Sequence, residues 1–129
     1  MRWINYGLVL IAHKKNIDRF GGSHGIKDNN AIYSCVETPL STFDGIDLYP
    51  TVEEKIIQCY YMFCKNHCFN DGNKRISIAM LLYLLKVNGF KLNMTQQELI
   101  DLGLRTASGE YSREKIICII KEKTVKDSL

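Results

Sequence analysis

The longest apolar stretch of the chain predicts a helix that lies in the middle of the molecule. In residues 76–87, every position is apolar except Ser77 and Lys86. A helix with apolar side chains all round has no face suited to water, so the rest of the protein has to surround it. The sequence therefore predicts a buried central helix, ended by the Asn-Gly pair that follows it.

A second apolar pattern predicts an amphipathic helix near the start of the chain, over residues 4–20. The spacing of its apolar residues favours a buried face that includes Leu8, Ile11, Ala12 and Lys15. A Gly-Gly pair would end this helix. The glycine-rich loop that follows lacks the spacing of a phosphate-binding motif, so we expect it to be a connection.

Four more helices are marked by residues that commonly cap helix N-termini. They are expected to begin after Asp28, Thr51, Thr95 and Ser112. The helix after Thr51 carries apolar residues at helical spacing, and the next position on that stripe is His67. We therefore expect this helix to end at His67 and its packing to fix the histidine ring.

Residues 39–50 interrupt the helical pattern with turn-forming residues. The Asp44-Gly45 pair with its neighbours predicts a small hairpin or an irregular loop. Residues 121–129 are expected to include a frayed basic end. Together, the elements predict an all-α fold of about six helices around the buried central one, in one domain that spans residues 1–129.

The composition agrees with an ordinary globular protein. The chain has 129 residues, of which 46% are hydrophobic and 24% charged, enough for one core but not two. The net charge of +3 comes without a basic stripe, so we expect no direct contact with nucleic acid. No apolar run approaches the roughly twenty residues that a membrane span needs, so we expect no membrane segment.

The cysteines and the first residues of the chain indicate its compartment. Five cysteines are scattered through the predicted helices, and the first residues lack the basic and then apolar layout of a signal peptide. We therefore expect reduced thiols and a cytoplasmic protein. Cys64, His67 and Cys68 share a predicted helical face, but no fourth ligand is evident, so a zinc site is not the favoured interpretation.

The polar loop in front of the central helix carries an unusual set of charges. Lys74 and Arg75 open the helix, although the N-terminus of a helix carries partial positive charge that disfavours cations. A bound anion would resolve this conflict, because free backbone amides and both side chains would converge on one negative group. Gly72 would let that anion approach the backbone, and phosphate is the obvious candidate.

Other residues of this loop suit the chemistry of a bound phosphate. Asp71 could hold a magnesium ion that bridges phosphates, since hard cations prefer carboxylate oxygens. A histidine such as His67 can accept a proton at cellular pH. Phe69 is expected to pin the loop to the core. Each residue alone has an ordinary explanation as turn or surface, but their presence within nine consecutive positions favours a functional loop.

Residues 67–75 resemble the signature loop of the Fic/Doc family, H-x-F-x-(D/E)-(G/A)-N-(G/K)-R, in its death-on-curing (Doc) branch. In this chain they are HCFNDGNKR. Residues 19–26, 47–51 and 107–110 also resemble recurring segments of bacterial Doc-type toxins. The resemblance covers nearly the whole chain. It implies the same helical fold, with residues 39–50 as a flap that pairs with an extended piece of the target protein.

Two positions depart from the pattern of the Fic proteins that transfer AMP. Lys74 stands where those enzymes have glycine, and Ile78 stands where they have a second arginine that orients the terminal phosphate of the nucleotide. Doc-type members show both departures. The resemblance therefore favours the Doc branch.

The resemblance implies an enzyme that transfers phosphate from ATP to a Ser or Thr hydroxyl of a protein, with Mg²⁺. It implies that the catalytic residues are His67, Asp71 and Arg75, and that Asp71 holds Mg²⁺. ATP would be bound by Gly72, Asn73, Lys74 and Arg75. The target would be bound at the flap by Thr42, Phe43 and Asp44.

The resemblance also implies partners. They are elongation factor Tu as the target, whose modification would stop translation, and a small cognate antitoxin. Two alternatives stay open. One is transfer of AMP or another nucleotide fragment to a target protein, and the other is a non-catalytic module that uses the loop to bind a phosphopeptide or an antitoxin.

Overall fold

The computed structural model describes residues 1–127, and it confirms the predicted all-α fold. The described part forms six α-helices, a short 3₁₀ turn at Thr38–Leu40 and two small pairs of strands. None of these helices has the length and apolar character needed to cross a lipid bilayer. The helices are α1 (Tyr6–Phe20), α2 (Asn29–Glu37), α3 (Val52–Lys65), α4 (Asn73–Val87), α5 (Gln96–Ala107) and α6 (Arg113–Lys123).

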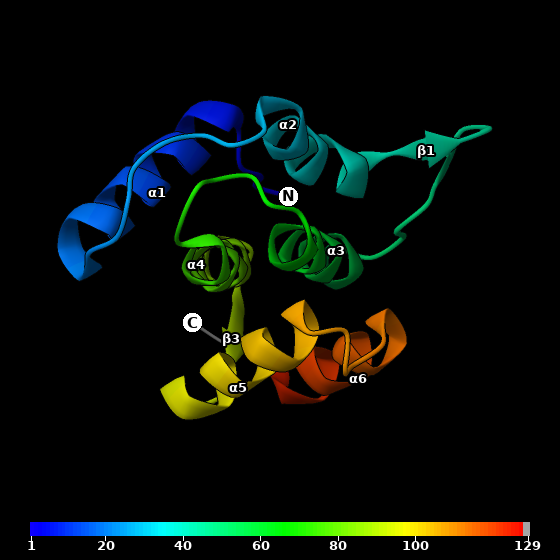
Figure 1. The fold of residues 1–129 in the computed structure, drawn as a ribbon. Helices are drawn as coiled ribbons and strands as arrows, with labels where there is room; N and C mark the ends of the chain where they lie inside the picture. Colours follow the sequence, from blue (N-terminus) through cyan, green and yellow to red (C-terminus); the bar gives the residue numbers. More distant parts are fainter. Residues whose placement is uncertain (128–129) are drawn as a thin grey trace.

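Helix α4 lies in the centre of the molecule, as the apolar stretch predicted. Figure 1 shows it end-on, with α1 and α2 above it, α3 beside it and α5 and α6 below. It packs against α1, α3 and α5. Its buried residues are Ile76, Ser77, Met80, Leu81, Leu84 and Leu85.

The prediction that α4 has no solvated face is wrong, because one side of the helix is open. Leu82 and Tyr83 are 41% and 39% exposed. Leu82 lines a surface hollow together with Phe20 at the end of α1 and Ile100 in α5. The neighbouring helices do not close around this side of α4, so a strip of apolar surface stays in contact with solvent.

The buried face of α1 also differs from the prediction. Val9, His13 and Ile17 are buried at a spacing of four residues, whereas Ile11 is 59% exposed and Lys15 is exposed as well. The prediction followed apolar residues and did not count His13 as part of the core. This ring is buried because it finds an aromatic and a polar partner in the loop before α4.

The predicted N-caps are confirmed. The side chains of Asp28, Thr51, Thr95 and Ser112 each accept a hydrogen bond from a backbone N–H three residues further on, at 3.0 to 3.2 Å. These bonds satisfy N–H groups that the first turn of a helix leaves without a partner. The starts of α2, α3, α5 and α6 therefore follow from the local sequence.

The hairpin predicted around Asp44 and Gly45 is confirmed. Strand β1 (Thr42–Phe43) pairs antiparallel with β2 (Ile46–Asp47), and the two residues between them have φ angles of 53° and 77°. Positive φ at both positions is typical of a type I′ turn. The hairpin projects from the helices (Figure 1), and its Phe43 is 76% exposed.

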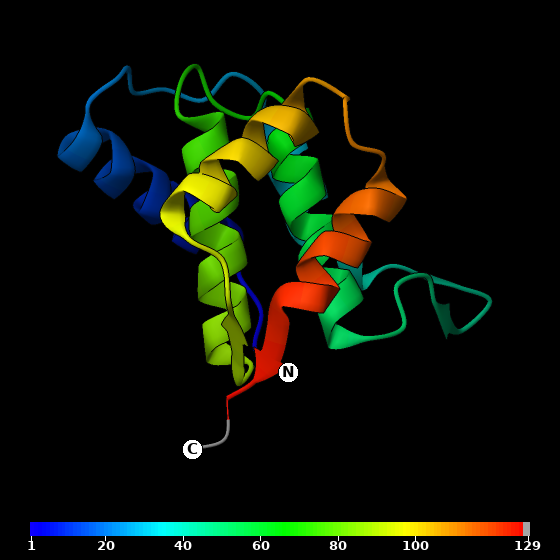
Figure 2. The same cartoon turned by 90° about the horizontal axis from the view of Figure 1, so that it is seen from below.

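A second pair of strands near the chain end differs from the prediction. Strand β3 (Phe90–Leu92) follows α4 and pairs antiparallel with β4 (Thr124–Lys126), which follows α6 (Figure 2). The expected frayed end is therefore wrong as far as Lys126, while residues 128–129 lie outside the described residues. This pairing joins segments that are distant in sequence, so no local sequence pattern predicts it.

Leu81 and Leu82 form a matched pair that tests the burial of α4. Leu81 is 0% exposed and its neighbour is 41% exposed. We expect Leu81→Ala to lower the free energy of unfolding by about 3 kcal/mol, because it removes buried methyl groups and leaves a cavity. Leu82→Ala should cost about 1 kcal/mol or less. Urea denaturation followed by circular dichroism measures both, and equal losses would contradict the burial of Leu81.

Candidate active site

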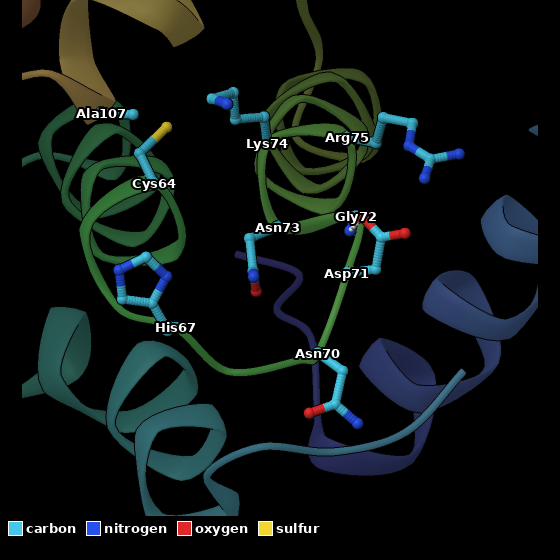
Figure 3. Close-up of a pocket in the computed structure, with 9 residues that line it drawn as sticks. All are labelled: Cys64, His67, Asn70, Asp71, Gly72, Asn73, Lys74, Arg75 and Ala107. Atoms are coloured by element: carbon cyan, nitrogen blue, oxygen red, sulfur yellow. Dashed lines mark hydrogen bonds between the residues drawn. The ribbon is translucent and has the colours of Figure 1, made fainter. Parts of the chain in front are cut away.

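The loop between α3 and α4 begins with an exposed histidine. Helix α3 ends at Lys65, and Asn66 after it is extended, with φ −90° and ψ 134°. His67 therefore lies beyond the helix and is exposed, so the prediction that helical packing fixes its ring is wrong. The extended residue turns the chain off the helical path just before the histidine. The ring of His67 lies at a hollow that the loop borders (Figure 3).

Phe69 anchors the loop to the core, as predicted. It is 1% exposed, and its ring stacks on that of His13 in α1 with 3.7 Å between the centroids. Nε2 of His13 lies 2.8 Å from the backbone oxygen of Asp71; a carbonyl oxygen only accepts, so Nε2 carries the proton. The predicted buried face of the first helix did not include His13. Its helical spacing to Val9 and Ile17 was the signal that could have found it.

The side chain of Asn73 closes the loop on itself. Its Oδ1 accepts a hydrogen bond from the N–H of Phe69 at 3.0 Å, and its Nδ2 donates to the carbonyl of Phe69 at 2.9 Å. Both ends of the amide are thus used within the protein. What Asn73 offers to a ligand is its backbone N–H, at the first position of α4.

The glycine-rich segment between α1 and α2 runs alongside this loop. The carbonyl of Gly25 accepts a hydrogen bond from the N–H of Asn70 at 3.1 Å. The carbonyl of Cys68 accepts one from the N–H of Lys27 at 2.9 Å. The two segments thereby form a short antiparallel bridge. The segment is therefore more than the plain connection predicted from its sequence, because it is a second support of the loop.

Asp71 is held by two backbone N–H groups. Its Oδ2 accepts from Ser23 at 3.0 Å and its Oδ1 from Gly72 at 2.8 Å. Both bonds lower the pKa of the Asp71 carboxyl below its usual value, and the bond from Ser23 has the larger effect. The group is therefore ionised at neutral pH. Within residues 1–127, no three His, Cys, Asp or Glu side chains gather as a metal site. Asp71 thus offers a single carboxylate, the kind of ligand that Mg²⁺ accepts when phosphates and waters supply the others.

The N-terminus of α4 has no side-chain cap. Gly72 occupies the N-cap position with a φ of 76°, and the N–H of Ile76 bonds back to its carbonyl. The N–H groups of residues 73–75 find no acceptor within residues 1–127. They carry the partial positive charge of the helix end. A Cβ on Gly72 would lie 3.1 Å from Cδ1 of Ile17, so packing against α1 also favours glycine here.

One hollow of about 470 Å³ brings the loop residues together (Figure 3). Every loop residue that the sequence analysis selected for catalysis, ATP or Mg²⁺ lines it. The flap residues Thr42, Phe43 and Asp44 do not, because the hairpin projects from the far end of α2 (Figure 1). The lining residues are Cys64, His67, Asn70, Asp71, Gly72, Asn73, Lys74, Arg75 and Ala107.

The two cations leave α4 in different directions. Lys74 extends toward the side of Cys64 and Ala107, whereas Arg75 extends toward α1 (Figure 3). A Cβ on Gly22 would lie 3.0 Å from Nη2 of Arg75, so this glycine leaves room for the guanidinium. The cations therefore flank the helix end from two sides. The expectation that both side chains converge on one spot is wrong.

Comparison with known proteins relates the chain to one family. The sequence model of the Fic/DOC family matches residues 3–85. The protein kinase doc of Escherichia phage P1 is 30% identical to this chain over 115 residues, which are 87% of each protein. The family match includes α1 and the glycine-rich segment, which support the loop before α4, and all residues that line the hollow except Ala107.

His13 and His24 form a matched pair that tests the support of the loop. His13 is 4% exposed, whereas the side chain of His24 is 53% exposed and contacts Asp18. We expect His13→Leu to lower the free energy of unfolding by about 2 kcal/mol, because the Asp71 carbonyl loses its donor and Phe69 its stacking partner. The amides of residues 67–72 should then exchange hydrogen faster.

His24→Leu serves as the control and should change the free energy of unfolding by about 0.5 kcal/mol or less. Chemical denaturation and hydrogen exchange read by mass spectrometry measure both effects. Unchanged exchange in residues 67–72 of the His13→Leu variant would show that the loop does not depend on His13.

Proposed function

Because the chain belongs to the Fic/DOC family, we propose that it is a toxin that transfers the terminal phosphate of ATP to a Ser or Thr hydroxyl of a target protein. The observation that carries this proposal is the hollow before α4, where a histidine, an ionised carboxylate and an uncapped helix end with two cations lie together. Phosphoryl transfer depends mainly on positioning and charge neutralisation, and these groups can supply both.

The phosphates of ATP would bind at the start of α4. The free N–H groups of residues 73–75 and the helix dipole favour an anion there. Lys74 and Arg75 flank this helix end from two sides, so an extended polyphosphate suits the arrangement better than a single phosphate does. The guanidinium of Arg75 can donate two parallel hydrogen bonds to phosphate oxygens.

Asp71 is the residue that would hold Mg²⁺. Its two hydrogen bonds from the backbone fix the carboxylate and keep it ionised, while each oxygen retains a further lone pair. The remaining ligands would be phosphate oxygens and water, as is common for Mg²⁺ that binds together with a nucleotide. The ion would neutralise charge on the phosphates.

His67 would accept the proton of the attacking hydroxyl. Its ring is exposed at the hollow and is free to approach a substrate. In the proposed reaction, the hydroxyl oxygen of the target bonds to the γ phosphorus, the bond from that phosphorus to the bridging oxygen breaks, ADP leaves, and the hydroxyl proton passes to His67. Arg75 would stabilise the charge on the transferred group.

Two residues favour transfer of the γ phosphate over transfer of AMP. Ile78 occupies the place of the second arginine in the AMP-transferring relatives, and its Cδ1 lies 3.8 Å from where a Cβ on Gly103 would be. This position therefore packs toward α5 and offers no charge. Without that arginine, a nucleotide that presents its α phosphate to His67 loses a contact to its terminal phosphate. Lys74 places an additional cation at the start of α4.

The resemblance to Doc-type toxins also suggests the partners. We propose elongation factor Tu as the target, so that translation stops, and a small cognate antitoxin that restrains the enzyme. The exposed strands of the flap, with Thr42 and Phe43, could hold an extended segment of the target through backbone hydrogen bonds. Because the flap lies away from the hollow, it would hold the target at some distance from the reacting hydroxyl.

The origin of the transferred phosphorus tests the proposal. The protein is incubated with a bacterial lysate, Mg²⁺ and ATP that carries a radioactive phosphorus at either the α or the γ position. We expect label from the γ position alone to appear in a lysate protein, because the γ phosphorus bonds to the target while the α phosphorus leaves with ADP. Gel autoradiography reads the label, and mass spectrometry of the labelled band identifies the target.

His67→Ala is the control for this experiment, and it should transfer no label from either position. Incorporation of the α label by the unaltered protein would instead indicate transfer of a nucleotide fragment. Undiminished growth inhibition by a well-folded His67→Ala variant would indicate a module that acts by binding alone.

Arg75→Ala should weaken ATP binding more than His67→Ala does. The first substitution removes a phosphate contact, whereas the second removes only a proton acceptor. We expect roughly a tenfold or larger loss of affinity for Arg75→Ala and about a twofold loss or less for His67→Ala. Isothermal titration calorimetry with ATP and Mg²⁺ measures both, and thermal unfolding without nucleotide checks that the variants fold. Equal affinities would contradict the proposed roles.

A further inference from the structure

A second hollow lies beside His67, between α2 and the end of α3. It measures about 600 Å³. Building on the proposed function, we propose that this hollow receives the segment of the target protein that carries the reacting hydroxyl. Its lining residues are Lys27, Asp28, Asn30, Ala31, Ser34, Lys65, Asn66 and His67.

The position of His67 is the first argument. Among the described residues, His67 alone lines both this hollow and the one before α4. A general base has to reach the hydroxyl whose proton it takes, while the phosphorus under attack lies beyond that hydroxyl. With ATP in the first hollow and the target segment in the second, His67 stands between the two substrates.

The chemistry of the lining is the second argument. Apart from Ala31, every residue that lines the second hollow is polar or charged, and no Phe, Tyr or Trp is among them. Sites for a nucleoside are mostly apolar, with rings that stack on the base. A polypeptide segment presents backbone N–H and C=O groups and polar side chains, which suit this lining better.

The charges of the second hollow indicate what kind of segment it accepts. Lys27 and Lys65 form no ion pair within residues 1–127. The carboxylate of Asp28 is engaged, because its Oδ1 accepts the N–H of Ala31 at 3.2 Å and caps α2. The carboxylate keeps its charge, but the two lysines outnumber it, so the lining is net positive and favours a segment with Asp or Glu close to the hydroxyl.

The walls of the second hollow are fixed relative to His67. The N–H groups of Lys27 and Asp28 both donate to the carbonyl of Cys68, at 2.9 and 3.1 Å. The sulfur of Cys68 also lies 3.7 Å from that of Cys35 in α2. Cys68, which follows His67, is thus bound to the loop before α2 and to α2 itself, and these form the opposite wall. The hollow is therefore formed before any substrate binds.

Ser34 and its neighbour Tyr33 provide a matched pair for the test. Ser34 lines the second hollow, whereas Tyr33 does not and stacks on Tyr6, with ring centroids 4.5 Å apart. Ser34→Trp fills the hollow, and Tyr33→Trp introduces the same side chain one position away. Lys27→Glu reverses the charge at the rim without adding bulk.

The experiment measures the rate at which the full chain transfers label to lysate proteins from ATP labelled at the α or γ position. Affinity for an unreactive ATP analogue with Mg²⁺ is measured in parallel, and thermal unfolding checks the fold of each variant. We expect Ser34→Trp to slow transfer about tenfold or more, which corresponds to about 1.4 kcal/mol, with the affinity for the analogue changed about twofold or less. Tyr33→Trp should leave both quantities unchanged, and Lys27→Glu should slow transfer.

Transfer by Ser34→Trp at the unaltered rate would overturn the inference. A loss of affinity for the ATP analogue in that variant would also overturn it, because the second hollow would then hold part of the nucleotide. If the α label is transferred and Ser34→Trp slows that transfer, the proposed phosphoryl transfer fails but the place of the target segment stands. If the γ label is transferred equally by all variants, the inference fails and the proposed function stands.

Discussion

The candidate site depends on the two hydrogen bonds that the Asn73 amide makes to the backbone of Phe69. They close the turn that leads into α4, and the buried ring of Phe69, stacked on His13, prevents the turn from shifting. His13 also holds the carbonyl of Asp71. The carboxylate and the free amides of the hollow therefore share one rigid support. Groups held in place before a substrate binds stabilise charge better than groups that must first reorganise.

The fold was predictable wherever its cause is local. The apolar run of α4, the N-caps and the Asp44-Gly45 turn each leave a pattern within a few residues, and the structure has all of them. The errors concern contacts between distant segments. His13 is part of the core because Phe69 and Asp71 meet it there, and β3 pairs with β4 because α6 brings the chain end back. The helical spacing of His13 to Val9 and Ile17 places it on the buried face but does not reveal its partners, and the pairing of β3 with β4 leaves no local signal.

The candidate site shows the same division. The sequence identified six of the residues that line the hollow, because they fall within nine positions and their types are unusual in front of a buried helix, but it did not point to Cys64, Asn70 or Ala107. It could not give their directions, so Lys74 and Arg75 flank the helix end and His67 lies outside α3. It also missed Ser23, whose backbone N–H binds Asp71 from another part of the chain. A backbone contact of this kind does not depend on the type of side chain, so no residue pattern reveals it.

The place of the hollow in the fold follows from what α4 can tolerate. Of the six helices in residues 1–127, α4 alone has an N-cap residue that makes no side-chain hydrogen bond. A missing cap typically costs about 1 kcal/mol, and cations in the first turn add to that cost. Burial of an apolar side chain contributes about 1.5–3 kcal/mol, and α4 buries several, including Leu81 and Leu84. A helix that buries this much apolar surface can therefore keep an uncapped, positively charged end, which is the feature that an anionic substrate would use.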